Sequence, residues 1–164
     1  MAKPATPASK ATTTAKVAPE PSVDNRRARF EYEILESWEA GIALTGTEIK
    51  SIRQGGVSLN EAYARVRDGE LWLVSMYVPP YKEGSWQNHD PKRPRKLLMH
   101  RGDIDRLAGM AAEKGLTVVP LRLYFKRGRV KVLIGLARGK KLWDKRRAIK
   151  ERESARELTR AARR

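Results

Sequence analysis

Two pairs of strand-like segments, each turning back at a glycine, constrain most strongly what this chain can fold into. The first pair spans residues 62–74 and turns at Asp68-Gly69, and the second spans residues 117–136 and turns at Arg127-Gly128. Turns of this kind join neighbouring strands that pair in antiparallel fashion. The pattern therefore predicts a mainly β protein that is built from hairpins.

Two short helices are expected between the strands. Thr45 and Glu48 have the spacing of a capping box, and Gly55-Gly56 follows, so a helix is expected over about residues 46–53. A second helix is expected over about residues 103–112, where three apolar residues share one helical face before Gly115.

The ordered region is expected to open with a strand, because Phe30, Tyr32 and Ile34 alternate with polar residues. Together with the hairpins and helices, this order of elements favours a small closed antiparallel β-barrel of the oligonucleotide-binding type.

Composition divides the chain into three parts. Residues 1–25 are mostly Ala, Thr and Pro with few large apolar residues, which predicts a disordered N-terminal arm. Residues 26–138 form the predicted body, long enough for one hydrophobic core. Residues 139–164 form a C-terminal tail with 11 Lys or Arg against 4 Asp or Glu.

The charge of the chain indicates a polyanionic partner. The formal net charge is +16, and body and tail are both basic, which favours a nucleic acid with two separate contacts. The tail lacks the apolar face of a membrane-surface helix, and no apolar run is long enough to span a bilayer. We therefore expect a monomeric, cytoplasmic protein without a membrane partner.

Residues that could carry catalysis or hold a metal are few. The chain has no Cys, and His89 and His100 lack metal-ligand spacing. No glycine-rich phosphate loop with a lysine is present. The sequence predicts a binding protein that is not an enzyme and needs no cofactor or metal.

A long polar loop is expected over residues 82–95. It contains Trp86, His89, Arg93 and Arg95 among other basic and aromatic residues, a mixture that suits single-stranded nucleic acid. Long polar loops within compact domains are often functional.

The tail begins with a dense basic motif around one aromatic residue, Trp143. Large apolar residues are too sparse in the tail for a core-facing stripe, so it is expected to be largely unfolded alone and to become helical on a polyanion. A solvated helix face is the alternative for any run of charges. Trp143 itself could stack on a base or fold back onto the body as an apolar anchor.

Several blocks of sequence, taken together, resemble the small protein B (SmpB, SsrA-binding protein) family. They occur in family order from residue 25 to the C-terminus and comprise Asn25-Arg26-Arg27-Ala28, Glu39-Ala40-Gly41-Ile42, Gly46-Thr47-Glu48-Ile49-Lys50-Ser51, Arg95-Lys96-Leu97-Leu98-Met99-His100, Val118-Val119-Pro120-Leu121, Lys131-Val132-Leu133-Ile134-Gly135 and Gly139-Lys140-Lys141 with Asp144-Lys145-Arg146.

This resemblance implies a function in ribosome rescue. An oligonucleotide-binding-like body would grip the tRNA-like domain of transfer-messenger RNA. The tail would enter the decoding centre and the empty messenger channel of a stalled 70S ribosome and become helical there. The nascent peptide would then be tagged for degradation, in the process called trans-translation.

The expected site residues follow from the resemblance and from the basic clusters. Glu39, Leu98 and His100 carry over as positions that grip the RNA, although spacing alone would place Leu98 in the core and His100 on an ordinary surface. The full RNA-binding set is Asn25, Arg26, Arg27, Glu39, Leu98, His100, Lys126 and Lys131. The ribosome-facing set is Gly139, Lys140, Lys141, Trp143, Asp144, Lys145 and Arg146.

Two features leave alternatives open. Trp143 departs from the family pattern, in which His or Tyr is frequent, and an indole can stack on a base but supplies neither imidazole nor phenol chemistry. Without the resemblance, a general basic RNA-binding or ribosomal protein, or an RNA-modifying enzyme with a basic tail, would also fit the charge.

Overall fold

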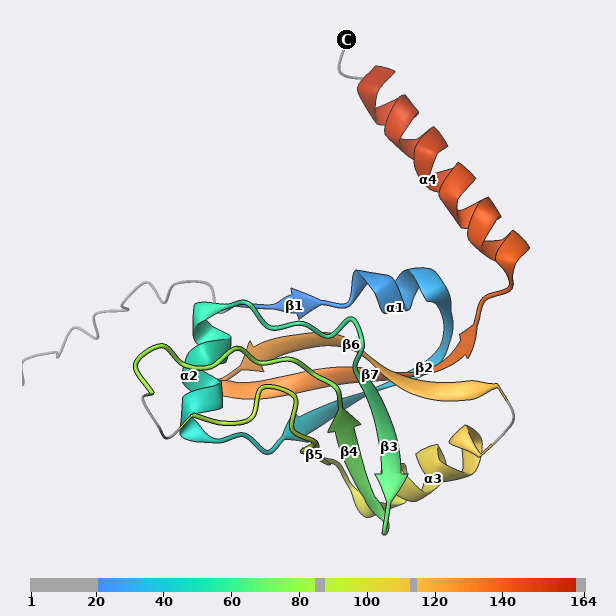
Figure 1. The fold of residues 1–164 in the computed structure, drawn as a ribbon. Coiled ribbons are helices and arrows are strands. Elements are labelled where there is room, and N and C mark those ends of the chain that lie inside the picture. Colours follow the sequence, from blue (N-terminus) through green and yellow to red (C-terminus); the bar gives the residue numbers. More distant parts are fainter. Residues whose placement is uncertain (1–20, 85–87, 113–114, 162–164) are drawn as a thin grey trace, which may run out of the picture.

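The structure, a computed structural model, describes residues 21–84, 88–112 and 115–161. Seven strands and four helices lie in these ranges (Figure 1). The strands are β1 (Val23–Asp24), β2 (Tyr32–Ile42), β3 (Tyr63–Arg67), β4 (Glu70–Val74), β5 (Arg95–Leu98), β6 (Leu116–Lys126) and β7 (Arg129–Gly139). The helices are α1 (Arg26–Glu31), α2 (Gly46–Gln54), α3 (Arg101–Ala111) and α4 (Leu142–Ala161).

All seven strands belong to one antiparallel sheet, in the order β1-β6-β3-β4-β5-β2-β7. Because β6 also pairs with β7, six of the strands follow one another in a ring, and β1 adds to one edge of β6. The prediction of a mainly β fold with short helices is confirmed.

The two predicted hairpins are confirmed, and their turns explain their register. Asp68 and Gly69 have φ of 52° and 71°, and Arg127 and Gly128 have φ of 52° and 72°. Two consecutive residues with positive φ form the turn whose twist matches that of antiparallel strands. The pairs next to the turns are Arg67 with Glu70 and Lys126 with Arg129.

The start of the ordered region differs from the prediction. Phe30 lies in helix α1 rather than in a strand, because Asn25 caps that helix by accepting a hydrogen bond from the Ala28 N–H at 3.0 Å. The strand begins at Tyr32 and runs as one element to Ile42. Residues 23–24, which the sequence assigned to the disordered arm, form β1 on the edge of β6. Residues 1–20 lie outside the described residues.

The core fills the inside of the strand ring. Its fully buried members come from five strands of the ring, from α2 and α3, and from the segment after β4: Ala40, Ile52, Leu71, Leu73, Met76, Leu97, Leu107, Leu123, Val132 and Ile134. Since the side chains of a strand alternate between faces, the residues between these core positions point outward. Beside α1 the outer face is closed, because Val119, Leu121 and Ala137 are buried in a cluster with Ala28.

Helix α2 is confirmed, and its capping box leads into a buried ion network. Glu48 Oε2 accepts from the Thr45 N–H at 2.8 Å, while its carboxylate also binds Arg93 and Arg95 at distances of 2.6–2.9 Å. Glu48 and Arg95 are fully buried. The prediction that Arg93 and Arg95 are loop residues for nucleic acid is therefore corrected. Arg95 begins β5, and both guanidinium groups bind the buried Glu48 carboxylate. Trp86 lies outside the described residues.

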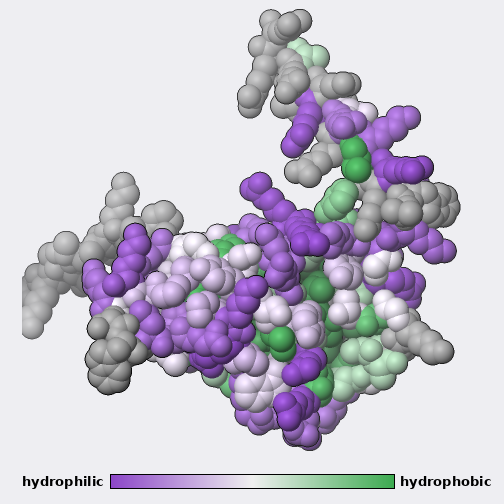
Figure 2. All heavy atoms as spheres, viewed as in Figure 1, coloured by the Kyte–Doolittle hydropathy of each residue, from purple (hydrophilic) through white to green (hydrophobic). Residues whose placement is uncertain are grey.

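The tail is a single helix in the structure, α4, where the sequence predicted a segment that is unfolded in isolation. It leaves the end of β7 and extends away from the body (Figure 1). Its described side chains Asp144, Arg146, Arg147, Ile149 and Lys150 are exposed. Figure 2 shows mostly hydrophilic residues on the described part of α4 and on much of the visible body. A helix with so little apolar surface gains little from packing on its own protein.

Candidate nucleic-acid interface

A polar cluster on the outer face of β2, β6 and β7 brings together three of the predicted RNA-binding residues. The Glu39 carboxylate on β2 accepts from Lys126 Nζ at 2.9 and 3.1 Å and lies 3.9 Å from Lys131 Nζ. It also accepts from the Tyr124 hydroxyl at 2.5 Å. One carboxylate thus holds two lysines and a tyrosine side by side at the surface.

Electrostatics keep the Glu39 carboxylate ionised and the Tyr124 hydroxyl protonated near neutral pH. Hydrogen bonds from Lys126 and then Tyr124 hold the pKa of Glu39 below its ordinary value, so the carboxylate is ionised. The same hydrogen bond to Glu39, helped by partial burial, raises the pKa of Tyr124 to about 12. The tyrosine is therefore a neutral donor with its hydroxyl directed at Glu39.

Tyr124 is the functional candidate that sequence reasoning missed. Its place in an alternating strand gave it no separate signal, although outward positions of β6 also carry Arg122 and Lys126. The Arg122 guanidinium lies over the Tyr124 ring, 5.9 Å from its centre. An aromatic ring among cations on an open sheet face is a suitable platform for a nucleobase.

Leu98 lies next to this cluster, on the neighbouring strand β5. It pairs with Gly41 on β2 and is 52% exposed, so the reading of Leu98 as a core residue is excluded. Leu98, Gly41 and Lys131 line one groove of about 440 Å³. A Cβ on Gly41 would lie 3.2 Å from Leu98 Cβ, so the glycine lets the two strands meet closely below the groove. Exposure of a large apolar side chain beside a lysine suits contact with a base or sugar.

His100 follows Leu98 by two residues and is exposed. Its backbone carbonyl accepts from the N–H groups of Asp103 and Ile104 and begins helix α3, while its side chain makes no capping bond. The His100 backbone is thus fixed at the start of α3, while its imidazole is open to solvent. The residue lies just beyond the end of β5 that carries Leu98.

Asn25 has a different role from the predicted one. Its side chain is 1% exposed, and its amide donates to the carbonyls of Leu59 and Pro120, both at 2.9 Å. With Oδ1 capping α1, its hydrogen-bonding groups are all used inside the protein, so an RNA contact through this side chain is excluded in this structure. Arg26 and Arg27 are exposed on α1, and Arg27 forms an ion pair with Glu31 at 3.0 Å.

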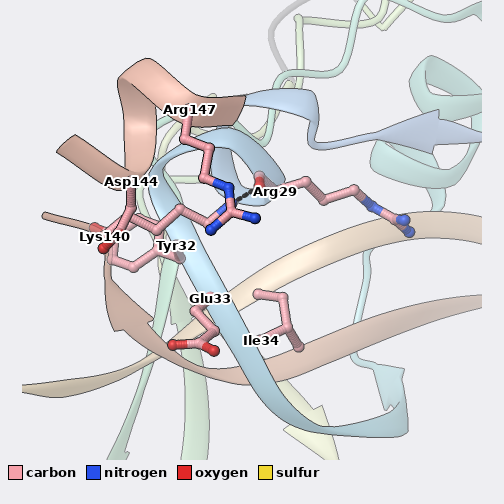
Figure 3. A pocket seen from close by; sticks show the side chains of 7 residues that line it. All are labelled: Arg29, Tyr32, Glu33, Ile34, Lys140, Asp144 and Arg147. Carbon is pink, nitrogen blue, oxygen red and sulfur yellow. Dashed lines mark hydrogen bonds between the residues drawn. The ribbon is translucent and has the colours of Figure 1, made fainter. Parts of the chain in front are cut away.

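The start of the tail is fixed to α1 and β2. The Lys140 N–H donates to the Glu31 carbonyl at 2.9 Å, and its ammonium donates to the Arg29 carbonyl at 3.3 Å. A concave pocket of about 670 Å³ lies here, lined by Arg29, Tyr32, Glu33, Ile34, Lys140, Asp144 and Arg147 (Figure 3).

The predicted ribosome-facing residues divide between this anchor and the helix. Gly139 ends β7 and pairs with Tyr32, whereas Lys140 forms the hydrogen bonds just given. Lys141, just before α4, and Asp144 and Arg146, near its start, are exposed. The side chains of Trp143 and Lys145 lie outside the described residues, so their predicted contacts stay predictions.

The described residues hold no group of three or more His, Asp or Glu side chains that could bind a metal ion. Among the described helices, none has the length and apolar character that crossing a membrane requires.

The fold and site define a class: small, mainly β proteins with a basic outer face and a basic helical tail, a combination typical of RNA-binding proteins. A narrower assignment comes from comparison with known families. The family model described as SmpB protein matches residues 22–164, so the chain belongs to the SmpB family.

Individual relatives support the same assignment. The SsrA-binding protein of Desulforudis audaxviator is 58% identical over 88% of this chain and 95% of its own length. That of Synechococcus sp. strain JA-3-3Ab is 63% identical over 84% of this chain and 90% of its own length. A chain in the solved structure "tmRNA-SmpB: a journey to the center of the bacterial ribosome" is 57% identical, with a TM-score of 0.64 over 74% of this chain and 86% of that one.

Proposed function

We propose that this protein binds the tRNA-like domain of transfer-messenger RNA and delivers it to stalled 70S ribosomes for trans-translation. The observation that carries the proposal is the placement of Glu39, Lys126, Lys131 and Leu98 on one continuous outer face. The likeness to SsrA-binding proteins and to a tmRNA–SmpB ribosome structure supports it. The body acts without catalysis or a cofactor, as a monomer in the cytoplasm.

The body serves as an oligonucleotide-binding-type barrel in this proposal. The ring of six antiparallel strands supports that description, since it presents open outer faces around a filled core. Arg26 and Arg27 add positive charge on α1, and His100 adds a ring beside Leu98. Asn25 supports the site by fixing α1.

The tail serves as the ribosome-facing arm. Its described side chains are mostly charged and exposed, so its helical order gains little from the body and more from neutralisation by ribosomal RNA. The tail therefore becomes ordered as it binds in the decoding centre. In that setting, Trp143 stacks on a ribosomal RNA base. If Trp143 instead packed against the body as an apolar anchor, Trp143→Ala would lower the melting temperature of the free protein.

Glu39→Ala distinguishes a specific RNA site from plain charge attraction. Removing a carboxylate that neutralises Lys126 and Lys131 would strengthen binding if only charge mattered. We expect weaker binding of transfer-messenger RNA instead, by roughly tenfold, because the lysines and Tyr124 lose the group that positions them. The measurement is a titration of the RNA at moderate salt.

Glu36→Ala is the matched control, because it makes the same charge change on the same strand. Glu36 is exposed and pairs with Arg106 of α3 at 3.1 Å, away from the Glu39 cluster. Its loss should leave RNA affinity within a factor of about two or strengthen it slightly. Equal behaviour of the two variants would remove Glu39 from the site.

The proposed function as a whole is tested by recovering the protein from a bacterial lysate and sequencing the RNA that comes with it. Strong enrichment of transfer-messenger RNA over tRNA and ribosomal RNA is the expected result. Even recovery of all structured RNAs would point to a general basic RNA-binding protein and would overturn the proposal.

A further inference from the structure

A second aromatic and basic surface lies on the outer face of β3, β4 and β5. Ala64, Leu71, Leu73 and Leu97 of these strands point into the core. By alternation, the residues between them point outward: Tyr63, Arg65 and Arg67 from β3, Glu70, Trp72 and Val74 from β4, and Lys96 and Leu98 from β5. We refer to these eight residues as the Trp72 face.

Trp72 occupies the centre of this face. In the strand register it lies directly between Arg65 on β3 and Lys96 on β5, so two cationic side chains flank one indole. Trp72 is only partly buried, and with Arg65, Arg67, Asp68, Glu70 and Pro94 it lines a pocket of about 280 Å³. This is slightly below the ~300–1,000 Å³ of small-molecule sites, so it suits one planar group of a larger ligand.

The charges of the Trp72 face leave positive groups available to a partner. Arg65 is exposed, and its side chain makes no hydrogen bond or ion pair within the described ranges. Among the described side chains, Arg67 forms an ion pair only with its neighbour Asp68 at 3.4 Å, and both of these side chains are at least 70% exposed. Lys96 pairs with Glu70, again at the surface. Such exposed pairs contribute little to folding and rearrange readily around a phosphate.

This face is continuous with the Glu39 site but separate from the tail. Leu98 is the outward residue that follows Lys96 on β5, and it lines the groove that also contains Lys131. The turn of the β3–β4 hairpin lies on the side of the body opposite α1 and α4 (Figure 1). A strand of RNA bound at the Glu39 site can therefore continue over β5 onto Trp72 without meeting the tail.

We propose that the Trp72 face is a further RNA-binding surface, on which an unpaired base stacks on Trp72 while Arg65 contacts the adjoining phosphate. The proposal rests on the proposed function, because the RNA is the same one held at the Glu39 site. Three cations and two acids around one indole suit an RNA better than a protein interface, whose centre is depleted of charged residues.

Three variants test the Trp72 face in titrations of full-length transfer-messenger RNA. Trp72→Ala should weaken binding by roughly 5- to 150-fold, the range for loss of one stacked base. Trp72→Phe should largely keep the affinity, since a ring remains to stack. Arg65→Gln should lower the slope of log affinity against log salt by ~0.7–0.9, the effect of one lost phosphate contact. Thermal melting identifies any loss of folding in Trp72→Ala.

Arg106→Gln provides the control for the loss of one exposed cation, since Arg106 lies on α3, pairs with Glu36 of β2 and is outside the Trp72 face. It should leave the salt slope unchanged. Ultraviolet crosslinking of the wild-type complex should attach nucleotides to the peptide that contains Trp72.

Normal affinity of folded Trp72→Ala and Arg65→Gln, together with no crosslink at Trp72, would overturn this proposal, whereas Glu39→Ala would still weaken binding. Failure of the wild-type protein to bind transfer-messenger RNA would instead overturn the proposed function.

Discussion

Replacing Glu48 by glutamine is expected to destabilise the protein by about 3–5 kcal/mol, a large fraction of the stability of a domain of this size. The substitution keeps the shape of the side chain but removes its charge, which leaves Arg95 fully buried without a counter-ion and Arg93 without its partner. The Arg95 guanidinium would keep only the carbonyls of Met76, Arg93 and Pro91. Urea unfolding followed by circular dichroism measures the loss.

Glu36→Gln is the control, because its ion pair with Arg106 is exposed and should contribute about 1 kcal/mol or less. If both variants unfolded at the same urea concentration as the wild type, the buried network would have no role in stability.

The pH dependence of stability provides an independent check on Glu48. Burial alone would raise the pKa of this carboxyl, but the hydrogen bonds from Arg93 and Thr45 and the charge of Arg95 outweigh it and lower the pKa. A carboxyl with a lowered pKa contributes stability above its unfolded-state pKa, and this contribution is lost as the pH falls through the folded-state value. Acid should therefore destabilise the wild type more steeply than Glu48→Gln.

Local patterns in the sequence predicted the elements that local interactions determine. Asp68-Gly69 is a favoured pair for two consecutive positive φ values, and at Arg127-Gly128 the glycine carries the turn signal, since it accepts positive φ without strain. The spacing of Thr45 and Glu48 likewise predicted the start of α2. In each case the interacting groups lie within a few residues, so the chain order alone contains the information.

The features that sequence reasoning missed depend on contacts between distant residues. Arg95 reads as a loop cation for nucleic acid, yet its partner Glu48 comes from a helix 47 residues earlier in the chain. Asn25 reads as part of an RNA-binding block, yet it holds the Pro120 carbonyl, 95 residues away. A sequence shows that a residue is polar but does not show whether folding buries it against a partner.

The residues of the candidate site also differ in how far the sequence predicted them. Glu39 and Leu98 were named only through the family resemblance, since a carboxylate opposes phosphate and a leucine suggests core. The structure supplies the physical account: Glu39 orders Tyr124 and Lys126, and Leu98 is exposed beside Lys131. Tyr124 and Trp72 were predicted to lie in strands but were not named as site residues, because strand alternation leaves either face possible until the core is known.

Removing the tail is expected to abolish tagging on stalled ribosomes while leaving the binding of isolated transfer-messenger RNA within about threefold of the full-length protein. The reason is the separation of the two surfaces: the Glu39 cluster lies on β2, β6 and β7, whereas the tail's described residues contact the body near α1 and the start of β2. A gel-shift titration measures the affinity. A reconstituted tagging reaction, on ribosomes stalled at the end of a messenger RNA without a stop codon, measures the activity.

Two end points make this test sharper. A variant ending at Lys141 keeps β7 and the hydrogen bonds of Lys140 to Glu31 and Arg29, so it removes α4 alone. A variant ending at Arg138 also removes this anchor, and the body's strands should still fold, because β7 loses only its last pair, Gly139 with Tyr32. Both should bind the RNA and fail in tagging.

Tagging by the Lys141 variant would place the ribosome contact in the anchor rather than in α4. Loss of RNA binding in both variants would show that the tail belongs to the RNA site.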